Sequence, residues 1–466
     1  MRGALPALAA ALSLLLAACT AEPSRQPAKA PAASRTQSPL GDGTTIRPGD
    51  LAGYLDSAEH DTALVPVANV PRRPPMDVEE AVGSDLAFTG GYAIAGNYLG
   101  FTVYDISRPE QPQVVSQVYC PGPQNDVTVS GNLLFLSVDL GMGGERCDAP
   151  GTGDWEGLRI FDIADKRAPR YVGAVRTPCG SHTATLIPSD DPASVYLFAT
   201  SAPSRTSGSA CHAAKGSITV VKVPVADPAR ATVAAQPELL EDGGSPAGTD
   251  HILVGGCHDV TVYAPKRLAA ASCIGDGLLL DVSDPLRPKV LDRVRDPKHF
   301  GYWHSAVFSQ DGSKVVFSDE FGGGRSSVCP PARGGTWGAN GVYTLKGTKL
   351  TLQGYFMIPR VARGTCSAHN GSLVPVPGRD VMVQGWYEGG VSVIDFTDPA
   401  HAREIGYFQR GHAPVSMGGS GGSWSAYYYN GYIYSSDLYS GLDVLKLTGV
   451  RQEGQRLTEF NAQTQG

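Results

Sequence analysis

Charged residues are scarce in this sequence, at 18% of the chain. Helical bundles and coiled coils need long runs rich in Glu, Lys, Ala and Leu, so this composition disfavours both classes. Lys and Arg are nowhere gathered into a run, and the formal net charge is −7. A nucleic-acid-binding protein needs a basic patch or stripe, so we expect no nucleic-acid partner.

Long apolar runs are also missing after the N-terminus, so no later segment is expected to cross a membrane as a helix. The first residues, MRGALPALAAALSLLLAAC, join Arg2 to a short apolar stretch, as a secretory signal peptide does. The stretch ends in LAAC at Cys19, which resembles a bacterial lipobox. We predict cleavage after residue 18, lipidation of Cys19, and an exported protein held at the cell envelope by its lipid. An ordinary signal peptide that happens to carry a Cys is the alternative.

CxxC pairs are absent, so a zinc ribbon is not supported. An even number of further cysteines in an exported chain indicates disulfides. These eight cysteines are Cys120, Cys147, Cys179, Cys211, Cys257, Cys273, Cys329 and Cys366.

Gly and Pro are abundant, with 57 and 35 residues, which suits many short strands joined by turns. One element recurs: a Gly or small residue, alternating apolar residues, an Asp, and in most copies a Pro-containing turn. Its seven copies are GFTVYDISRPEQP from Gly100, GLRIFDIADKRAP from Gly157, SITVVKVPVADP from Ser217, GLLLDVSDPLRP from Gly277, GVYTLKG from Gly341, GVSVIDFTDPA from Gly390 and GLDVLKLTG from Gly441.

Each copy follows a pattern typical of a β-hairpin, such as NDVTVSGNLLFLSVD from Asn125, and most precede a further short strand. The repeat is therefore four antiparallel strands, named a to d from the inside outwards. We predict an all-β, seven-bladed β-propeller of four-stranded antiparallel blades. The last copy lacks a strand d, and ALVPVANVPRRPP from Ala63 is expected to close that blade.

The predicted organisation has four parts. Residues 1–18 are a signal peptide, 19–62 a lipidated Cys and disordered tether, 63–449 the propeller, and 450–466 a polar C-terminal tail. The GLxVxDxxxPxxP element resembles the bacterial LVIVD-repeat propellers, and the lipobox fits their usual export. The resemblance covers about residues 63–449 and implies architecture without a settled reaction.

Histidine recurs at the start of strand a in four consecutive repeats, as His182, His258, His304 and His369. The other repeats carry Asp85, Asp126 and Trp424 at or beside this position. Innermost strands line the axis of a propeller, and imidazole is the commonest transition-metal ligand. The pattern therefore predicts an axial four-histidine site for a transition metal (Cu, Fe or Zn). Two alternatives remain open: hydrogen bonding within each blade, and a polar pocket without metal.

Carboxylates follow the end of strand b on the same face, as Asp139, Glu320 and Glu388 do. Asp126, Glu320, Glu388 and Trp424 are candidates for orienting the histidines. The cysteines also fall on this face, and we predict sequential pairs: 120–147, 179–211, 257–273 and 329–366.

The predicted function is binding of a transition metal or ligand at this face by an envelope-anchored lipoprotein. A metal-dependent oxidoreductase and a metal-free scaffold that binds protein or glycan are the alternatives, so whether the protein is an enzyme stays open. We expect a monomer, and the sequence identifies no small-molecule or protein ligand.

Overall fold

The computed structural model describes residues 52–139, 141, 143–147, 154–201, 216–246, 256–324, 329, 336–360, 364–411 and 421–466. The signal peptide, Cys19, most of the predicted tether and Cys211 lie outside these residues. The chain divides into two units, Met1–Gln37 and Ser38–Gly466, and the second unit contains every described residue.

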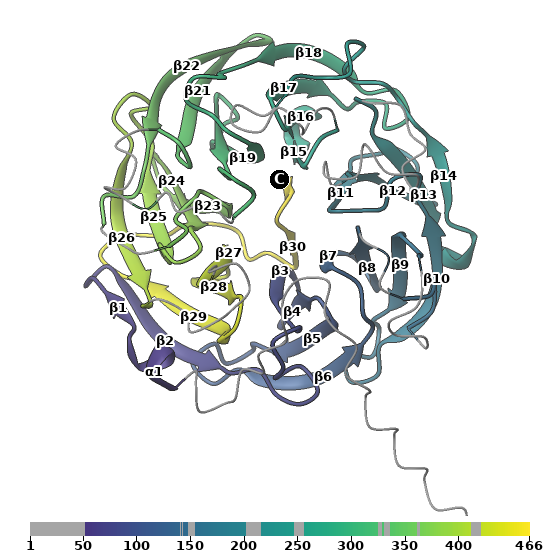
Figure 1. Cartoon of the computed structure of the whole chain (residues 1–466), viewed down its shortest axis with the longest axis horizontal. Helices are drawn as coiled ribbons and strands as arrows, with labels where there is room; N and C mark the ends of the chain where they lie inside the picture. Colours follow the sequence, from purple (N-terminus) through teal and green to yellow (C-terminus); the bar gives the residue numbers. More distant parts are fainter. Residues whose placement is uncertain are drawn as a thin grey trace, which may run out of the picture. The chain divides into compact units, whose positions relative to one another are not determined.

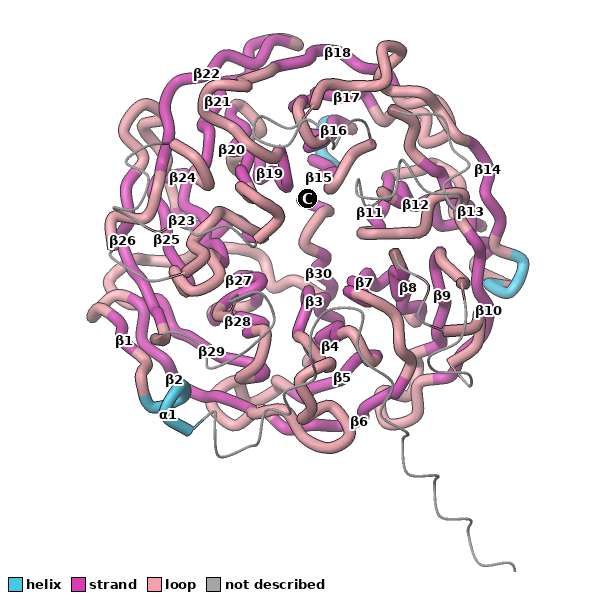
Figure 2. Tube along the Cα trace, in the orientation of Figure 1, coloured by secondary structure: helices cyan, strands magenta, loops and turns pink. Residues whose placement is uncertain are grey.

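Strands make up most of the described structure, and helices are confined to short pieces (Figure 2). Three sheets have four antiparallel strands each, in the orders β10-β9-β8-β7, β11-β12-β13-β14 and β19-β20-β21-β22. Their strands are β7 (Gln124–Ser130), β8 (Leu133–Val138), β9 (Gly157–Asp162), β10 (Arg170–Arg176), β11 (Ala184–Ile187), β12 (Ser194–Ala199), β13 (Thr219–Pro224), β14 (Thr232–Ala235), β19 (Trp303–Phe308), β20 (Lys314–Asp319), β21 (Asn340–Lys346) and β22 (Lys349–Phe356).

Two larger sheets contain the remaining strands. One has the order β1-β26-β25-β24-β23-β27-β28-β29-β2, and the other β18-β17-β16-β15-β31-β30-β3-β4-β5-β6. Their strands are β1 (Glu59–His60), β2 (Leu64–Val70), β3 (Gly83–Thr89), β4 (Tyr92–Asn97), β5 (Gly100–Asp105), β6 (Gln113–Tyr119), β15 (Asp259–Tyr263), β16 (Leu268–Cys273), β17 (Asp276–Asp281), β18 (Lys289–Val294), β23 (Asn370–Val376), β24 (Arg379–Gly385), β25 (Val391–Asp395), β26 (Arg403–Gln409), β27 (Ser423–Tyr429), β28 (Tyr432–Asp437), β29 (Gly441–Leu447), β30 (Glu459–Asn461) and β31 (Thr464–Gln465).

Runs of four consecutive strands are arranged around a central axis, with the first strand of each run innermost (Figure 1). Burial follows this order: every residue of β8 and β19 is buried, whereas β6 and β10 at the periphery are mostly half-buried with exposed ends. Apolar side chains of neighbouring runs pack together, as Phe198 packs with Leu278. Near-continuous apolar runs such as LLFLSV in β8 suit this position, because both faces of the strand meet other sheets, whereas the innermost strands β3 and β7 also carry polar residues.

The N-terminal strand β2 pairs antiparallel with β29, from Leu64 opposite Leu447 to Val70 opposite Leu442. This is the partner that the sequence predicts for the last repeat. The predicted tether, however, extends too far. Within residues 52–62, α1 (Ala52–Asp56) buries Tyr54 against Asp437, and β1 pairs with β26. The stretch is polar overall and therefore resembles a linker, but its Tyr54 is buried and donates its hydroxyl to the Asp437 carboxylate.

The C-terminal residues also differ from a free polar tail, because they enter the axis of the second unit (Figure 1). Strand β30 pairs with β3, and β31 pairs parallel with the end of β15. The side chains of Asn461, Gln463 and Gln465 are all buried. Residues 459–465 therefore supply hydrogen bonds at the axis, whereas most of residues 451–456 are exposed.

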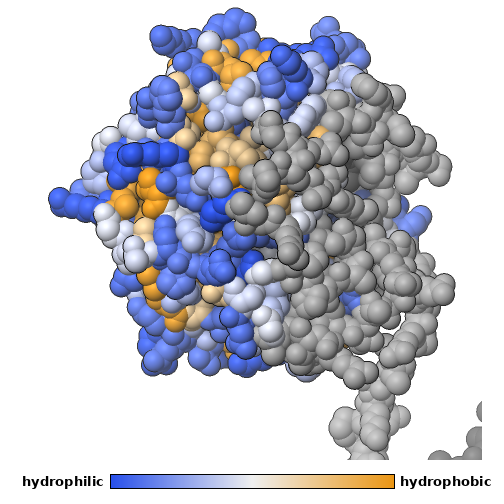
Figure 3. Space-filling view, turned by 60° about the vertical axis from the view of Figure 1, so that its left-hand side comes forward, coloured by the Kyte–Doolittle hydropathy of each residue, from blue (hydrophilic) through white to orange (hydrophobic). Residues whose placement is uncertain are grey.

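The outer surface in Figure 3 mixes hydrophilic residues with small groups of apolar ones. This is the pattern expected where outer strands cover a core on one side and meet water on the other. In the part of the chain that is described, helices are too short or too polar to cross a bilayer.

Candidate metal centre

The four predicted histidines occupy equivalent positions at the start of four innermost strands. His304 lies in β19, and the other three precede β11, β15 and β23 by one or two residues. The main-chain N–H of His182 donates to Thr200, that of His258 to Ser272, and that of His369 to Gly385. Each acceptor lies at or beside the end of the neighbouring second strand, so the strand pairing itself fixes where each imidazole begins.

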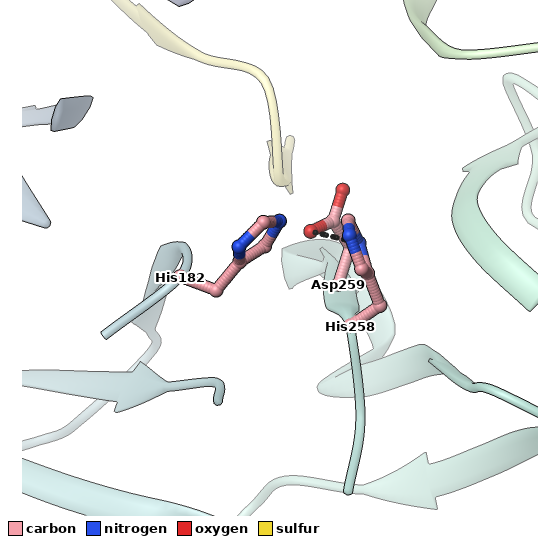
Figure 4. A group of neighbouring side chains, drawn as sticks. All are labelled: His182, His258 and Asp259. Atoms are coloured by element: carbon pink, nitrogen blue, oxygen red, sulfur yellow. Dashed lines mark ion pairs between the residues drawn. The ribbon is translucent and has the colours of Figure 1, made fainter. Parts of the chain in front are cut away.

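The imidazole rings follow one another in a continuous series. Ring centroids are 4.0 Å apart for His182 and His258, 4.1 Å for His258 and His304, and 4.1 Å for His304 and His369. All four residues are at most 5% exposed. The structure thus brings together all four histidines that the sequence singled out, and Figure 4 shows His182 pointing toward His258 and Asp259.

Two of the histidines are oriented by strong acceptors. The Nδ1–H of His182 donates to Asp139 at 2.9 Å, and that of His369 donates to the main-chain oxygen of Trp424 at 2.5 Å. Such bonds fix the tautomer and leave Nε2 available to a ligand. The carbonyl of Trp424 thus contacts one of the predicted histidines, and the Trp424 ring lies 4.6 Å from that of His369.

Glu320 sits between two imidazoles, just after β20. Its carboxylate oxygens lie 3.7 Å from Nε2 of His304 and 3.6 Å from Nε2 of His369. The hydroxyl of Tyr387 donates to it, and the main chain of Tyr387 is held in the left-handed region at φ 50°. Strain of this kind is often found at functional sites. Burial raises the pKa of Glu320 to about 7.

The other two candidate orienting residues act elsewhere. Glu388 accepts the main-chain N–H of Thr365, four residues before His369, and so holds the loop that leads into β23. Asp126 faces a carboxylate rather than a histidine: burial, and then the charge of Asp85, raise its pKa well above the usual range. Among the described residues, Asp126 forms no hydrogen bond or ion pair with an imidazole.

Asp259 belongs to the site although the sequence pattern did not single it out. It follows His258 directly, and one oxygen lies 3.2 Å from Nδ1 of that histidine. The signal was present: Asp259 falls at the register of Asp85 and Asp126 in other repeats. Burial raises its pKa to about 6.

Several polar atoms of this cluster are buried without a hydrogen-bond partner. They are Nδ1 of His258, Nδ1 of His304, Nε2 of His369 and both carboxylate oxygens of Asp259. The short His258–Asp259 approach lacks the geometry of a hydrogen bond. An unsatisfied buried polar group costs about 1–3 kcal/mol, so native proteins avoid concentrating them unless a ligand completes the set.

Burial and neighbouring charges determine which imidazoles of the cluster carry a proton charge. Burial alone would lower the pKa of His182, but its bond to Asp139 and that residue's charge outweigh burial and raise it. Burial, and then the neighbouring His182, lower the pKa of His258 well below the usual range. Burial and the adjacent imidazoles lower that of His304 likewise, and burial lowers that of His369 to about 3. At neutral pH three of the four rings are therefore uncharged, the form in which imidazole binds metals.

The donor atoms form two groups that could hold a metal ion, namely His182 with His258 and Asp259, and His258 with His304 and Glu320. Within each group the ligand atoms lie within 4.8 Å of one another. Three of the four predicted histidines are therefore divided between two groups that share His258, and each group includes a carboxylate. His369 adjoins the second group through Glu320.

Disulfides flank this end of the axis. The structure contains Cys120–Cys147, Cys257–Cys273 and Cys329–Cys366, three of the four predicted pairs. Cys257 directly precedes His258, and Cys366 comes three residues before His369. The pair Cys179–Cys211 stays a prediction, because Cys211 lies outside the described residues. These bridges fix the loops from which the histidines emerge and keep their sulfurs from acting as thiolate ligands.

Comparisons with known proteins add the fold and no more. No family model and no curated protein matches the chain. Among solved structures, the β-propeller domain of Cps50 (Swd1) from Myceliophteria thermophila is similar over 83% of this chain and 100% of its own, with 11% identity and a TM-score of 0.51. A Bacteroides uniformis protein, described as a candidate 6-phosphogluconolactonase, is similar over 82% of this chain and 96% of its own, with 12% identity and a TM-score of 0.50. Identity this low speaks only for the architecture, which is all-β and propeller-like.

Proposed function

We propose that this protein is an exported, lipid-anchored β-propeller that binds a transition metal at its axis through the histidine cluster. The observation that carries the proposal is the concentration of buried donor atoms without partners on His258, His304, His369 and Asp259. A bound cation would complete the coordination of these atoms and offset the buried carboxylate charge.

The donor set also limits the kind of metal. Imidazole nitrogens with one or two carboxylate oxygens suit Zn, Cu, Fe or Ni, whereas Ca and Mg prefer sets made only of oxygen. Asp139 and Tyr387 support the donors from outside by holding His182 and Glu320. Outer partners of this kind fix ligand geometry in metal sites and raise ligand basicity.

The finer architecture belongs to the same proposal. The runs β3–β6, β7–β10, β11–β14, β15–β18, β19–β22 and β23–β26 would be six blades. The seventh would be β27–β29 with β2, which would close the ring without a covalent link and leave no exposed sheet edge. The repeats resemble LVIVD propellers, and the disulfides fit export into an oxidising compartment. The LAAC sequence supports anchoring through Cys19.

Metal analysis tests the function directly. We expect protein purified from the cell envelope to carry close to stoichiometric or higher transition metal by mass spectrometry. The double variant His258→Ala/His304→Ala should lose it while keeping its circular dichroism spectrum. His401→Ala, at an exposed histidine paired with Asp398, is the matched control and should retain the metal.

Two results would overturn the proposal. One is absence of bound metal in the wild type, both as isolated and after reconstitution with Zn²⁺ or Cu²⁺, which would favour a metal-free scaffold. The other is unchanged metal content in the folded double variant, which would place the metal elsewhere in the chain.

A further inference from the structure

We propose that the histidine cluster holds two cations side by side, with His258 shared between them. One position is formed by His182, His258 and Asp259, and the other by His258, His304 and Glu320. This inference rests on the proposed function and goes beyond it, because the repeat pattern alone suggests one ion at the hub of four imidazoles.

The distances between the donor atoms favour two ions over one. Bonds from Zn²⁺ to nitrogen or oxygen are about 2.0–2.2 Å long, so two ligands of one ion lie at most about 4.4 Å apart. Both three-residue groups come close to this limit, with all donor atoms within 4.8 Å. Among the described residues, no such group contains both His182 and His304. A single ion therefore cannot be bound by the whole series unless the rings move.

Charge is the second argument. Each group has its own buried carboxylate, Asp259 in one and Glu320 in the other, and these residues are 1% and 6% exposed. A cation in only one position would leave the other carboxylate without a bound counter-ion beside it. A buried carboxylate that neither a cation nor a proton neutralises is strongly unfavourable. Both oxygens of Asp259 also lack a well-aligned hydrogen bond, although the side chain of Thr183 lies close enough to lower its pKa, and this favours a ligand on that side.

The supporting contacts are duplicated in the same way. On one side the Nδ1–H of His182 donates to Asp139, and on the other the hydroxyl of Tyr387 donates to Glu320. Each position therefore has one outer partner that orients one of its ligands. A single metal centre with a spectator histidine would not need both.

His258 is the link between the positions. Its ring centroid lies 4.0 Å from that of His182 and 4.1 Å from that of His304. The two nitrogens of an imidazole lie on different edges of the ring, so one ring can serve two ions once it gives up its hydrogen bond to the main chain of His304. Binding through both nitrogens requires the ring to release its remaining N–H proton to water, as metal ligation releases protons in general.

Zn²⁺ titration of the metal-free, full-length protein tests the inference by calorimetry and by metal content after gel filtration. We expect two equivalents per chain in the wild type and one in each of Asp259→Asn and Glu320→Gln. His258→Ala should lose both. Asp398→Asn, at an exposed aspartate outside the cluster, should keep two and serves as the matched control.

The outcomes separate the two proposals. One equivalent in the wild type would refute the pair of cations and leave the metal-binding function standing, whereas no binding at all would refute both. Complete loss in both Asp259→Asn and Glu320→Gln, with the fold retained by circular dichroism, would show one joint site and also refute the pair. If Asp259→Asn does not fold, His182→Ala tests the same position.

Discussion

The two ends of the innermost strands bury polar side chains in opposite ways. At one end, imidazoles and carboxylates are crowded together and several of their atoms lack partners. At the other end, the buried amide side chains of the C-terminal residues form hydrogen bonds with main-chain groups. Asn461 accepts the N–H of Val129 at 2.7 Å and donates to the carbonyl of the same residue at 2.8 Å, and Gln465 accepts the N–H of Phe308 at 2.7 Å.

The difference separates structural from functional polarity. Hydrogen-bonded amides such as that of Asn461 connect the tail to inner strands that are distant in the sequence. They therefore stabilise the fold whether or not a ligand is bound. The partly unsatisfied imidazoles and carboxylates lower stability until something binds, which is the usual compromise at a functional site. Gln463 lies between the two ends: it donates to Asp85 from the tail, and its carbonyl accepts the N–H of Val262.

Truncation before β30 should give the largest effect on stability. A chain that ends at Thr458 loses the pairing of β30 with β3 and of β31 with β15, and it leaves the Val129 and Phe308 main chains buried without partners. At about 1–3 kcal/mol for each unsatisfied group, we expect the free energy of unfolding to fall by more than about 4 kcal/mol. Urea denaturation of the metal-free protein measures it.

Point variants test the contribution of the tail to stability without changing the chain length. Asn461→Ala should lower the free energy of unfolding by about 2–4 kcal/mol, because both hydrogen bonds to Val129 are lost. Gln455→Ala, at an exposed tail residue, should change it by less than about 0.5 kcal/mol. A truncated chain as stable as the wild type would mean that the tail lies at the axis without contributing to stability.

The opposite result is expected at the histidine end. In the metal-free protein His304→Phe removes a buried nitrogen without a partner and keeps an aromatic ring of similar size. We expect the metal-free variant to be as stable as the wild type or more stable, by up to about 1–2 kcal/mol, while its metal affinity collapses. The measurement is thermal unfolding with and without Zn²⁺. A loss of more than about 2 kcal/mol in the metal-free form would show that His304 is structural, as the blade hydrogen-bonding alternative holds.

The same contrast explains what could be predicted from the sequence. Strand runs were predictable because each repeat carries its own alternation and turn residues, and the histidines because their register recurs. The tail was not, since β30 and β31 are two or three residues long, carry no apolar alternation and depend on main-chain groups of distant strands. The division into two donor groups also depends on side-chain directions set by contacts such as His182 with Asp139. A one-dimensional pattern does not contain those directions.

The smallest effect is expected from Asp126, whose carboxylate is buried beside that of Asp85. Burial, followed by the charges of Asp85 and Asp259, raises its pKa well above the unfolded value of about 3.9. The folded state therefore keeps a proton that the unfolded state loses, so this contribution to stability is complete below about pH 4 and declines as the pH rises toward the folded pKa.

Asp126→Asn removes that dependence. The stability of the variant relative to the wild type should rise between pH 4 and 7, at no more than about 1.4 kcal/mol for each pH unit. Urea denaturation of both metal-free proteins at each pH measures the difference, in which groups common to both proteins cancel. Parallel curves would mean that Asp126 is ionised in the folded protein and that the pair with Asp85 holds no extra proton.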